Sequence, residues 1–204
     1  MILSLYSFNI LLQTIATILS LLFLIKDKSS FLKLLSILLL ITVSIEFIGL
    51  YLMKNEKPSI YYYHFLSLIE FPIIFLMYER FIAVKKVLIF PKIILIITFL
   101  FWVLTFFKFM FYELTIILGS LSVSILIILY LRELLMSDKI LNYRKLLPFW
   151  VAVGFLLFYL SSIPFFSLQD YMKDRGLFSV LFVLIIIKCL FIIFGLITCN
   201  KRES

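Results

Sequence analysis

The chain has 204 residues, of which 65% are hydrophobic and 15% are charged, and its mean hydropathy is +1.22. Soluble domains are about 45–50% apolar and about 25% charged, so this composition excludes a water-soluble globular fold and a flexible Gly/Ser-rich linker. The net charge is +8. This positive charge is explained by lysines and arginines that flank the apolar segments, where they face anionic lipid headgroups. We therefore expect no nucleic-acid partner.

Seven segments of the sequence are apolar over roughly the 20 residues that a helix needs to cross a bilayer. In chain order they cover residues 2–25, 34–53, 60–78, 93–107, 114–131, 148–168 and 177–199. Each run is continuous, whereas the strands of membrane β-barrels alternate in polarity. No basic region precedes the first run, so we expect it to be retained as a transmembrane helix.

The sequence therefore predicts an all-α membrane protein with a single seven-transmembrane-helix domain over residues 1–204. Because the connections are short, we expect an antiparallel bundle in which successive helices are neighbours. The loops after the first, third and fifth spans and the C-terminal tail hold 13 Lys and Arg residues, and the N-terminus and the other loops hold 5. Basic loops remain in the cytoplasm, which predicts an N-terminus outside and a cytoplasmic C-terminus.

Polar side chains inside the spans are candidates for function, since an ionisable group in a membrane is costly unless it is paired or hydrated. At 1.5 Å per residue, Glu46, Glu70 and Lys188 lie roughly 10, 15 and 16 Å below the outer ends of their spans. We expect a polar layer in the outer half of the bundle. Its candidate residues are Asn9, Gln13, Glu46, His64, Glu70, Ser161, Ser162 and Lys188.

This layer has two interpretations, which the sequence leaves open. It is either a structural network, in which Lys188 pairs with Glu70 or Glu46, or a partly hydrated cavity that binds a small ligand or a lipid headgroup. In the third span, Tyr63, Ser67 and Glu70 share one helical face, which places hydroxyl groups beside Glu70. His64 lies about 120° around the helix from Glu70, so the two are not expected to form an acid–base pair.

No motif predicts catalytic residues, a metal site or a cofactor. A His-Glu-x-x-His zinc site needs two histidines, and the chain has one. Gly119-Ser120 lacks the spacer of a rhomboid-type serine protease, and we expect Ser120, Ser122 and Ser124 to form a close-packing helix face instead. Cys189 and Cys199 are expected to act as small apolar side chains. Lys188 lies in the middle of the seventh span, as a retinal-binding lysine would. However, Leu184 occupies the position that is acidic in microbial rhodopsins. Retinal binding is therefore a remote alternative.

Residues 46–51, 63–71, 78–80 and 148–159 carry a resemblance to a group of seven-span membrane proteins of Bacteroidetes to which no activity is assigned. In that group a Glu, a Tyr/His pair and a second Glu recur on spans 2 and 3, matched here by Glu46, Tyr63-His64 and Glu70. The resemblance covers most of the chain and implies a bacterial inner-membrane location. Some members are encoded near sensor kinases, which favours signalling. Lys188 departs from the group, which has an uncharged polar residue at this position.

We therefore expect a small sensory or signalling membrane subunit that binds an apolar or amphiphilic ligand in the polar layer and acts through a partner protein. Its partners would be membrane lipids and a protein that docks on basic cytoplasmic loops containing Lys85, Lys86, Arg144 and Lys145. The alternative is a lipid-modifying enzyme of the hydrolase type, in which Glu46, His64 and Glu70 act on a headgroup.

Overall fold

The computed structural model describes residues 2–105, 112–168 and 178–200, and all regular structure within these ranges is helical. Seven of the helices are long and apolar enough to cross a membrane, which makes the chain a multi-pass helical membrane protein. They are α1 (Ile2–Lys26), α2 (Ser30–Lys54), α3 (Ile60–Tyr78), α4 (Ile89–Thr105), α5 (Tyr112–Leu135), α6 (Leu147–Leu168) and α7 (Phe178–Asn200). Short 3₁₀ segments, η1 (Glu79–Phe81), η2 (Lys85–Leu88) and η4 (Asp138–Lys145), lie in the connections.

Several helices extend beyond the predicted apolar spans because a helix continues into the headgroup region, where charged side chains are tolerated. α2 begins four residues before the predicted position 34, and the Ser29 side chain accepts a hydrogen bond from the Leu32 amide there at 3.3 Å. This interaction satisfies one of the free N–H groups at the helix start. α4 also begins four residues early, with Pro91 in its first turn, where a missing N–H costs nothing. The predicted residues 106, 107 and 177 lie outside the described part of the chain.

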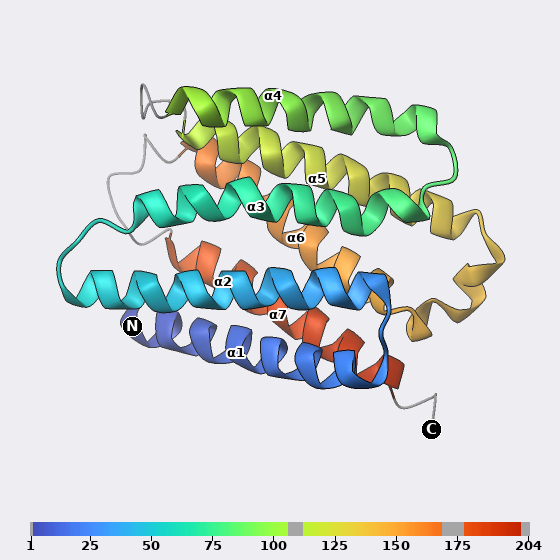
Figure 1. The fold of residues 1–204 in the computed structure, drawn as a ribbon, viewed down its shortest axis with the longest axis horizontal. Coiled ribbons are helices and arrows are strands. Elements are labelled where there is room, and N and C mark those ends of the chain that lie inside the picture. Colours follow the sequence, from blue (N-terminus) through green and yellow to red (C-terminus); the bar gives the residue numbers. More distant parts are fainter. Residues whose placement is uncertain (1, 106–111, 169–177, 201–204) are drawn as a thin grey trace.

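The helices lie side by side along the long axis of the molecule, as Figure 1 shows. The most extensive contacts join α6 to α7, α5 to α6, α4 to α5, and α1 to both α7 and α2. α3 lies between α2 and α5, whereas α4 packs mainly on α5 and meets α3 over a much smaller area. The α1–α2, α3–α4 and α5–α6 connections lie at one end of the molecule, called the basic end below, and the α2–α3 connection lies at the opposite end.

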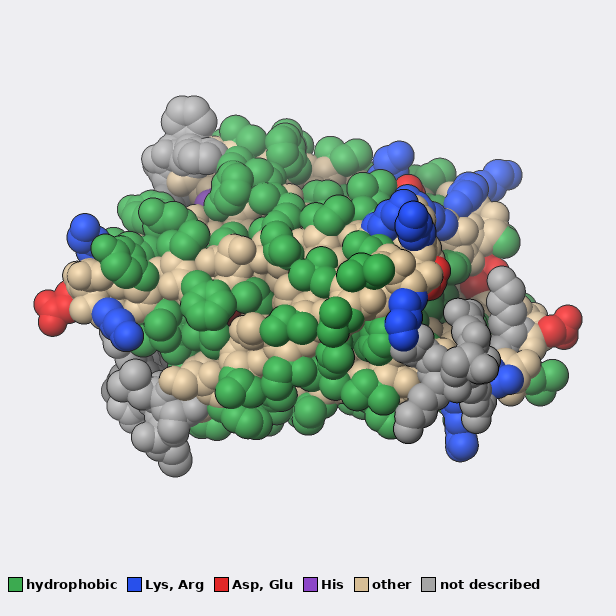
Figure 2. Space-filling view, turned by 60° about the horizontal axis from the view of Figure 1, so that its bottom comes forward, with side chains coloured by type: hydrophobic (Ala, Val, Ile, Leu, Met, Phe, Trp, Pro, Cys, Tyr) green, Lys and Arg blue, Asp and Glu red, His purple; other side chains and the backbone are tan. Residues whose placement is uncertain are grey.

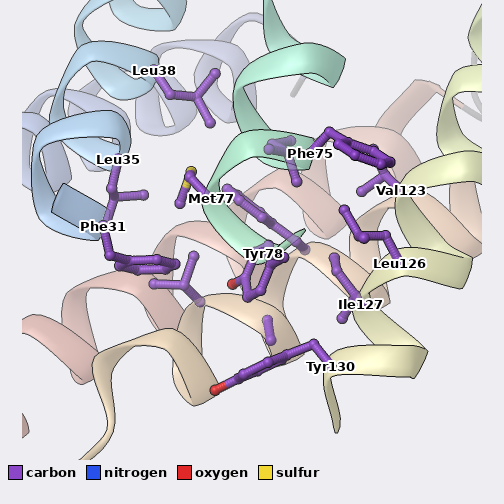
Figure 3. Packing of buried hydrophobic residues seen from close by; sticks show 14 of the residues in the cluster. Phe31, Leu35, Leu38, Phe75, Met77, Tyr78, Val123, Leu126, Ile127 and Tyr130 are labelled. Carbon is purple, nitrogen blue, oxygen red and sulfur yellow. The ribbon is translucent and has the colours of Figure 1, made fainter. Parts of the chain in front are cut away.

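The apolar core fills the half of the bundle nearest the basic end. Figure 3 shows how side chains from α2, α3 and α5 meet there. The Tyr78 ring contacts Phe31 and Tyr130, with centroids 5.6 and 5.0 Å apart, and its hydroxyl donates to the Pro148 carbonyl at 3.1 Å. This half is therefore closely packed and largely apolar, and most of the polar side chains predicted in the spans lie in the other half.

The serine-rich face of α5 is a close-packing surface, as predicted. A Cβ atom on Gly119 would lie 2.1 Å from the Phe71 ring of α3, so only glycine allows this approach. Ser120, Ser122 and Ser124 are buried, and the Ser122 hydroxyl donates to the Pro91 carbonyl of α4 at 2.7 Å. Small residues let helices approach closely in membranes, where no hydrophobic effect drives them together.

Candidate functional site

The carboxyl group of Glu46 is the centre of a hydrogen-bonded group that joins α1, α2 and α3. The hydroxyls of Tyr6 and Tyr63 donate to Glu46 Oε2 at 3.2 and 3.0 Å, and the two hydroxyls lie 3.4 Å apart. Gly49, one turn along α2, provides the space, because a Cβ there would lie 2.6 Å from the Tyr63 hydroxyl. Two phenol groups therefore hold a buried carboxyl group between three helices.

Two buried amide side chains of α1, one of them bonded to this carboxyl group, are not fully hydrogen-bonded. Gln13 hydrogen-bonds to Glu46 through its side chain, but its Oε1 atom has no partner. Asn9, one turn earlier, has no partner for either Oδ1 or Nδ2. Both residues are only 2% exposed. Buried polar groups are normally satisfied, and these three atoms leave hydrogen-bonding capacity unused inside the bundle.

Lys188 of α7 lies at the same depth as Gln13. Tyr6 of α1 contacts Phe182 of α7 with ring centroids 5.8 Å apart, and both helices run toward the basic end (Figure 1). Gln13 and Lys188 follow these two residues by similar distances along the chain, about 10 and 9 Å at 1.5 Å per residue. Lys188 interacts electrostatically with Glu46, so the charged and amide groups of three helices share one layer.

The predicted ion pair between Lys188 and Glu46 or Glu70 is not formed. Within the described residues, the Lys188 ammonium instead lies over the Phe158 ring of α6, 4.3 Å from its centroid. A cation over an aromatic face is attracted by the ring quadrupole. Tyrosine hydroxyls donate to one oxygen of each carboxyl group instead, to Glu46 Oε2 and to Glu70 Oε1.

Glu70 belongs to a different group, between α3 and α6. The Tyr159 hydroxyl donates to Glu70 Oε1. Ser162, one turn further along α6, is buried and donates to the Tyr159 carbonyl at 2.8 Å, and its hydroxyl lies 3.4 Å from that of Ser120. Ser161 is exposed on the helix surface and takes no part in this group, although the sequence grouped it with Ser162. Neighbouring residues on a helix point about 100° apart, and only one of the two faces the bundle.

His64 forms a third group, between α3 and α4. Its ring stacks on Trp102, with centroids 5.1 Å apart, and its Nε2 atom hydrogen-bonds to the Thr105 hydroxyl. The Trp102 indole N–H donates to the His64 carbonyl at 3.0 Å. Five of the eight residues predicted as one layer, Gln13, Glu46, His64, Glu70 and Ser162, therefore fall into three hydrogen-bonded groups, around Glu46, Glu70 and His64. The sequence analysis missed four partners in these groups, Tyr6, Tyr159, Trp102 and Thr105, because tyrosine, tryptophan and threonine are common in apolar spans and gave no distinct signal.

The predicted partner-docking residues are exposed at the basic end, where Figure 2 shows Lys and Arg side chains gathered. The Lys85 ammonium donates to the Glu79 carbonyl at 2.8 Å, which folds the side chain back on its own connection. The Arg144 guanidinium donates to the Tyr143 hydroxyl at 3.3 Å, and this hydrogen bond raises the pKa of Arg144. Lys86 and Lys145 extend from the same two connections.

The described residues contain no cluster of three or more His, Cys, Asp or Glu side chains that could hold a metal ion. No protein-family model, curated protein or solved structure matches the chain. The three polar groups and the charge of the basic end are the features of this chain that bear on its function.

Proposed function

We propose that this protein is a sensory or signalling subunit of a bacterial inner membrane, which binds a small amphiphilic ligand beside Glu46 and acts through a partner protein. In this proposal the helices form an antiparallel bundle with the N-terminus outside and the C-terminus in the cytoplasm. The ligand enters from the outer half, and the partner docks on the cytoplasmic basic end. Membrane lipids surround the bundle.

The observation that carries the proposal is the set of unsatisfied amide atoms on α1, on Gln13 beside Glu46 and on Asn9 one turn before it. Asn9 Oδ1 and Nδ2 and Gln13 Oε1 are buried without partners, and each such atom in an apolar medium costs roughly 1–3 kcal/mol. Apolar residues at both positions would avoid this cost, so stability alone does not account for Asn9 and Gln13. Their presence is explained if a ligand supplies both a donor and an acceptor to them.

The charge distribution supports the orientation and the docking surface. Three connections meet at the basic end, and most loop Lys and Arg residues lie on them. Basic loops are retained in the cytoplasm. They also attract acidic protein surfaces and anionic lipids, through interactions that weaken as salt rises.

Ligand binding can be tested by native mass spectrometry of the protein released from nanodiscs that keep its own membrane lipids. We expect a bound small molecule in the wild type and its loss in Asn9→Leu and Gln13→Leu, which keep the side-chain size but remove the amide. Ser161→Ala changes an exposed residue of α6 and serves as the control. Equal retention in all four proteins, or no bound mass in the wild type, would contradict the proposal.

Partner docking needs a separate experiment. The double substitution Lys86→Glu and Arg144→Glu reverses the charge of two connections at the basic end, and we expect it to abolish co-purification of a cross-linked partner. Lys57→Glu, at the opposite end, is the matched control. If lipid turnover is found instead, and is lost in Glu70→Gln and His64→Ala, the enzymatic alternative replaces the signalling proposal.

A further inference from the structure

The three polar groups share one helix, α3. Tyr63 donates to α2, His64 stacks on α4, and Glu70 accepts a hydrogen bond from α6. All three residues precede Pro72, the proline inside this helix, and they belong to residues 60–71, called the first half of α3 below. Polar contacts therefore join the first half of α3 to three neighbouring helices.

The second half of α3, after Pro72, is held by apolar packing instead. Met77 and Tyr78 are both 0% exposed and belong to the apolar core. Phe71, directly before the proline, packs so closely on α5 that a Cβ atom on Gly119 would lie 2.1 Å from its ring. The second half is therefore fixed in the bundle, and the contact of Phe71 with α5 provides a pivot where the two halves meet.

Pro72 is the position at which α3 bends most easily. Proline has no N–H to donate to the carbonyl four residues earlier, and its ring crowds that carbonyl, so sharp helix bends occur mostly at prolines. Pro72 also lines a pocket of about 40 Å³ between α3, α4 and α5. Closely packed interiors resist displacement, but α3 and α4 meet over only a small area. The pocket therefore gives the first half of α3 room to move toward α4.

A small bend is enough to break the contact between Tyr63 and Glu46. Tyr63 precedes Pro72 by roughly 13 Å along the helix, at 1.5 Å per residue. A bend of about 5° moves Tyr63 by about 1 Å, whereas sharp kinks exceed about 20°. A movement of this size away from Glu46 takes the 3.0 Å hydrogen bond beyond hydrogen-bonding distance. Leu68, which lines the pocket, moves by only about 0.5 Å in the same bend.

The other two polar groups connect the first half of α3 to the docking surface. His64 contacts α4 and Glu70 contacts α6. α4 follows directly after η2, which contains Lys85 and Lys86, and α6 follows η4, which contains Arg144 and Lys145. A displacement of the first half of α3 therefore acts on the two helices that begin at the predicted docking residues.

We infer that α3 is a ligand-controlled switch, which bends at Pro72 when the hydrogen bond from Tyr63 to Glu46 is broken. A polar group bound to Gln13 competes with Tyr63 for the adjacent Glu46 carboxyl group, so the ligand stabilises the bent state. The inference rests on the proposed function for the identity of the trigger. The switch itself can be tested without a ligand, because Tyr63→Phe removes the same hydrogen bond, so its failure is distinguishable from the absence of a bound ligand.

Fluorine NMR of the full-length protein in nanodiscs tests the switch. A trifluoromethyl label is attached, in a cysteine-free background, to a cysteine at Tyr61, which is 62% exposed on the first half of α3, or at Lys86 in η2. We expect Tyr63→Phe to raise the population of a second state about fivefold at both labels, the factor that one hydrogen bond contributes. Lys28, exposed in the α1–α2 connection, is the control position and should report no change. Unchanged spectra at either Tyr61 or Lys86 would overturn the inference.

Two further substitutions in the Tyr63→Phe background separate bending from the local effect of the lost hydroxyl. Pro72→Ala restores the N–H that a straight helix uses, and Thr98→Leu fills the pocket that Thr98 lines. Each should return the spectra to those of the wild type, with melting curves to show that the proteins remain folded. Pro164→Ala makes the matched change inside α6 and should leave the second state populated. A second state that persists with Pro72→Ala or with Thr98→Leu would refute bending at Pro72.

Discussion

The fit of two tyrosines around Glu46 depends on the absence of a side chain at Gly49. A Cβ atom there would lie 2.6 Å from the Tyr63 hydroxyl and 3.3 Å from that of Tyr6. Contacts of a Cβ shorter than 3.4 Å are tight, so the Tyr63 hydroxyl would have to retreat by about 0.8 Å. If this displacement points away from Glu46 Oε2, the 3.0 Å hydrogen bond lengthens to at most about 3.8 Å, which is beyond hydrogen-bonding distance.

Gly49→Ala therefore has two opposing effects on the free energy of unfolding. Loss of the Tyr63 hydrogen bond to a buried carboxyl group costs about 1–3 kcal/mol. The higher helix propensity of alanine returns about 1 kcal/mol. We expect a net loss of up to about 2 kcal/mol, measured by reversible unfolding in mixed micelles with increasing dodecyl sulfate.

A double-mutant cycle with Tyr63→Phe isolates the effect. In that background the Tyr63 hydroxyl is absent and the Tyr6 hydroxyl, at 3.3 Å, needs to move by only about 0.1 Å. Gly49→Ala should therefore be neutral or stabilising by up to about 1 kcal/mol. The difference between the two backgrounds, about 1–3 kcal/mol, measures the coupling between Gly49 and the hydroxyl group. If Gly49→Ala costs the same in both backgrounds, the glycine does not act by making room for Tyr63.

Two further predictions concern individual contacts, and a third concerns the orientation in the membrane. Gly119→Ala should destabilise the protein by about 1–3 kcal/mol in the same unfolding assay, because its methyl group overlaps the Phe71 ring; unchanged stability would contradict this packing. Tyr159→Phe should cost about 1–3 kcal/mol, because the Glu70 carboxyl loses its phenol donor; a neutral result would show that another group replaces the donor. Asn142→Cys, in a Cys199→Ser background, should react with an impermeant maleimide only after inner-membrane vesicles are inverted; reaction in intact cells would reverse the orientation.

Several features of the fold could be predicted from the sequence because they depend on local properties. In lipid every backbone N–H and C=O needs a partner within the protein, and a helix provides these partners within a single segment. A long apolar run is therefore expected to form a helix. As far as the structure describes them, the seven expected ranges fall on helices. The close-packing face of α5 was also predictable, because glycine and serine recur on it and small side chains have this role in membranes.

The partners of the polar groups could not be predicted in the same way. Tyr63 and Glu70 share a face of α3 in the sequence pattern, yet Tyr63 donates to Glu46 of α2, and Glu70 accepts from Tyr159 of α6. Lys188, expected to pair with a carboxylate, lies over Phe158 instead.

The physical reason is that helical periodicity fixes angles within one helix, whereas contacts between helices depend on how each helix is rotated and how closely it approaches its neighbours. Those quantities are set by packing at a few positions, such as Gly49 beside Tyr63 and Gly119 beside Phe71. A rotation of one residue, about 100°, separates buried Ser162 from exposed Ser161. The sequence by itself determined that polar groups are present inside seven apolar helices, and only the tertiary structure decided which of them meet.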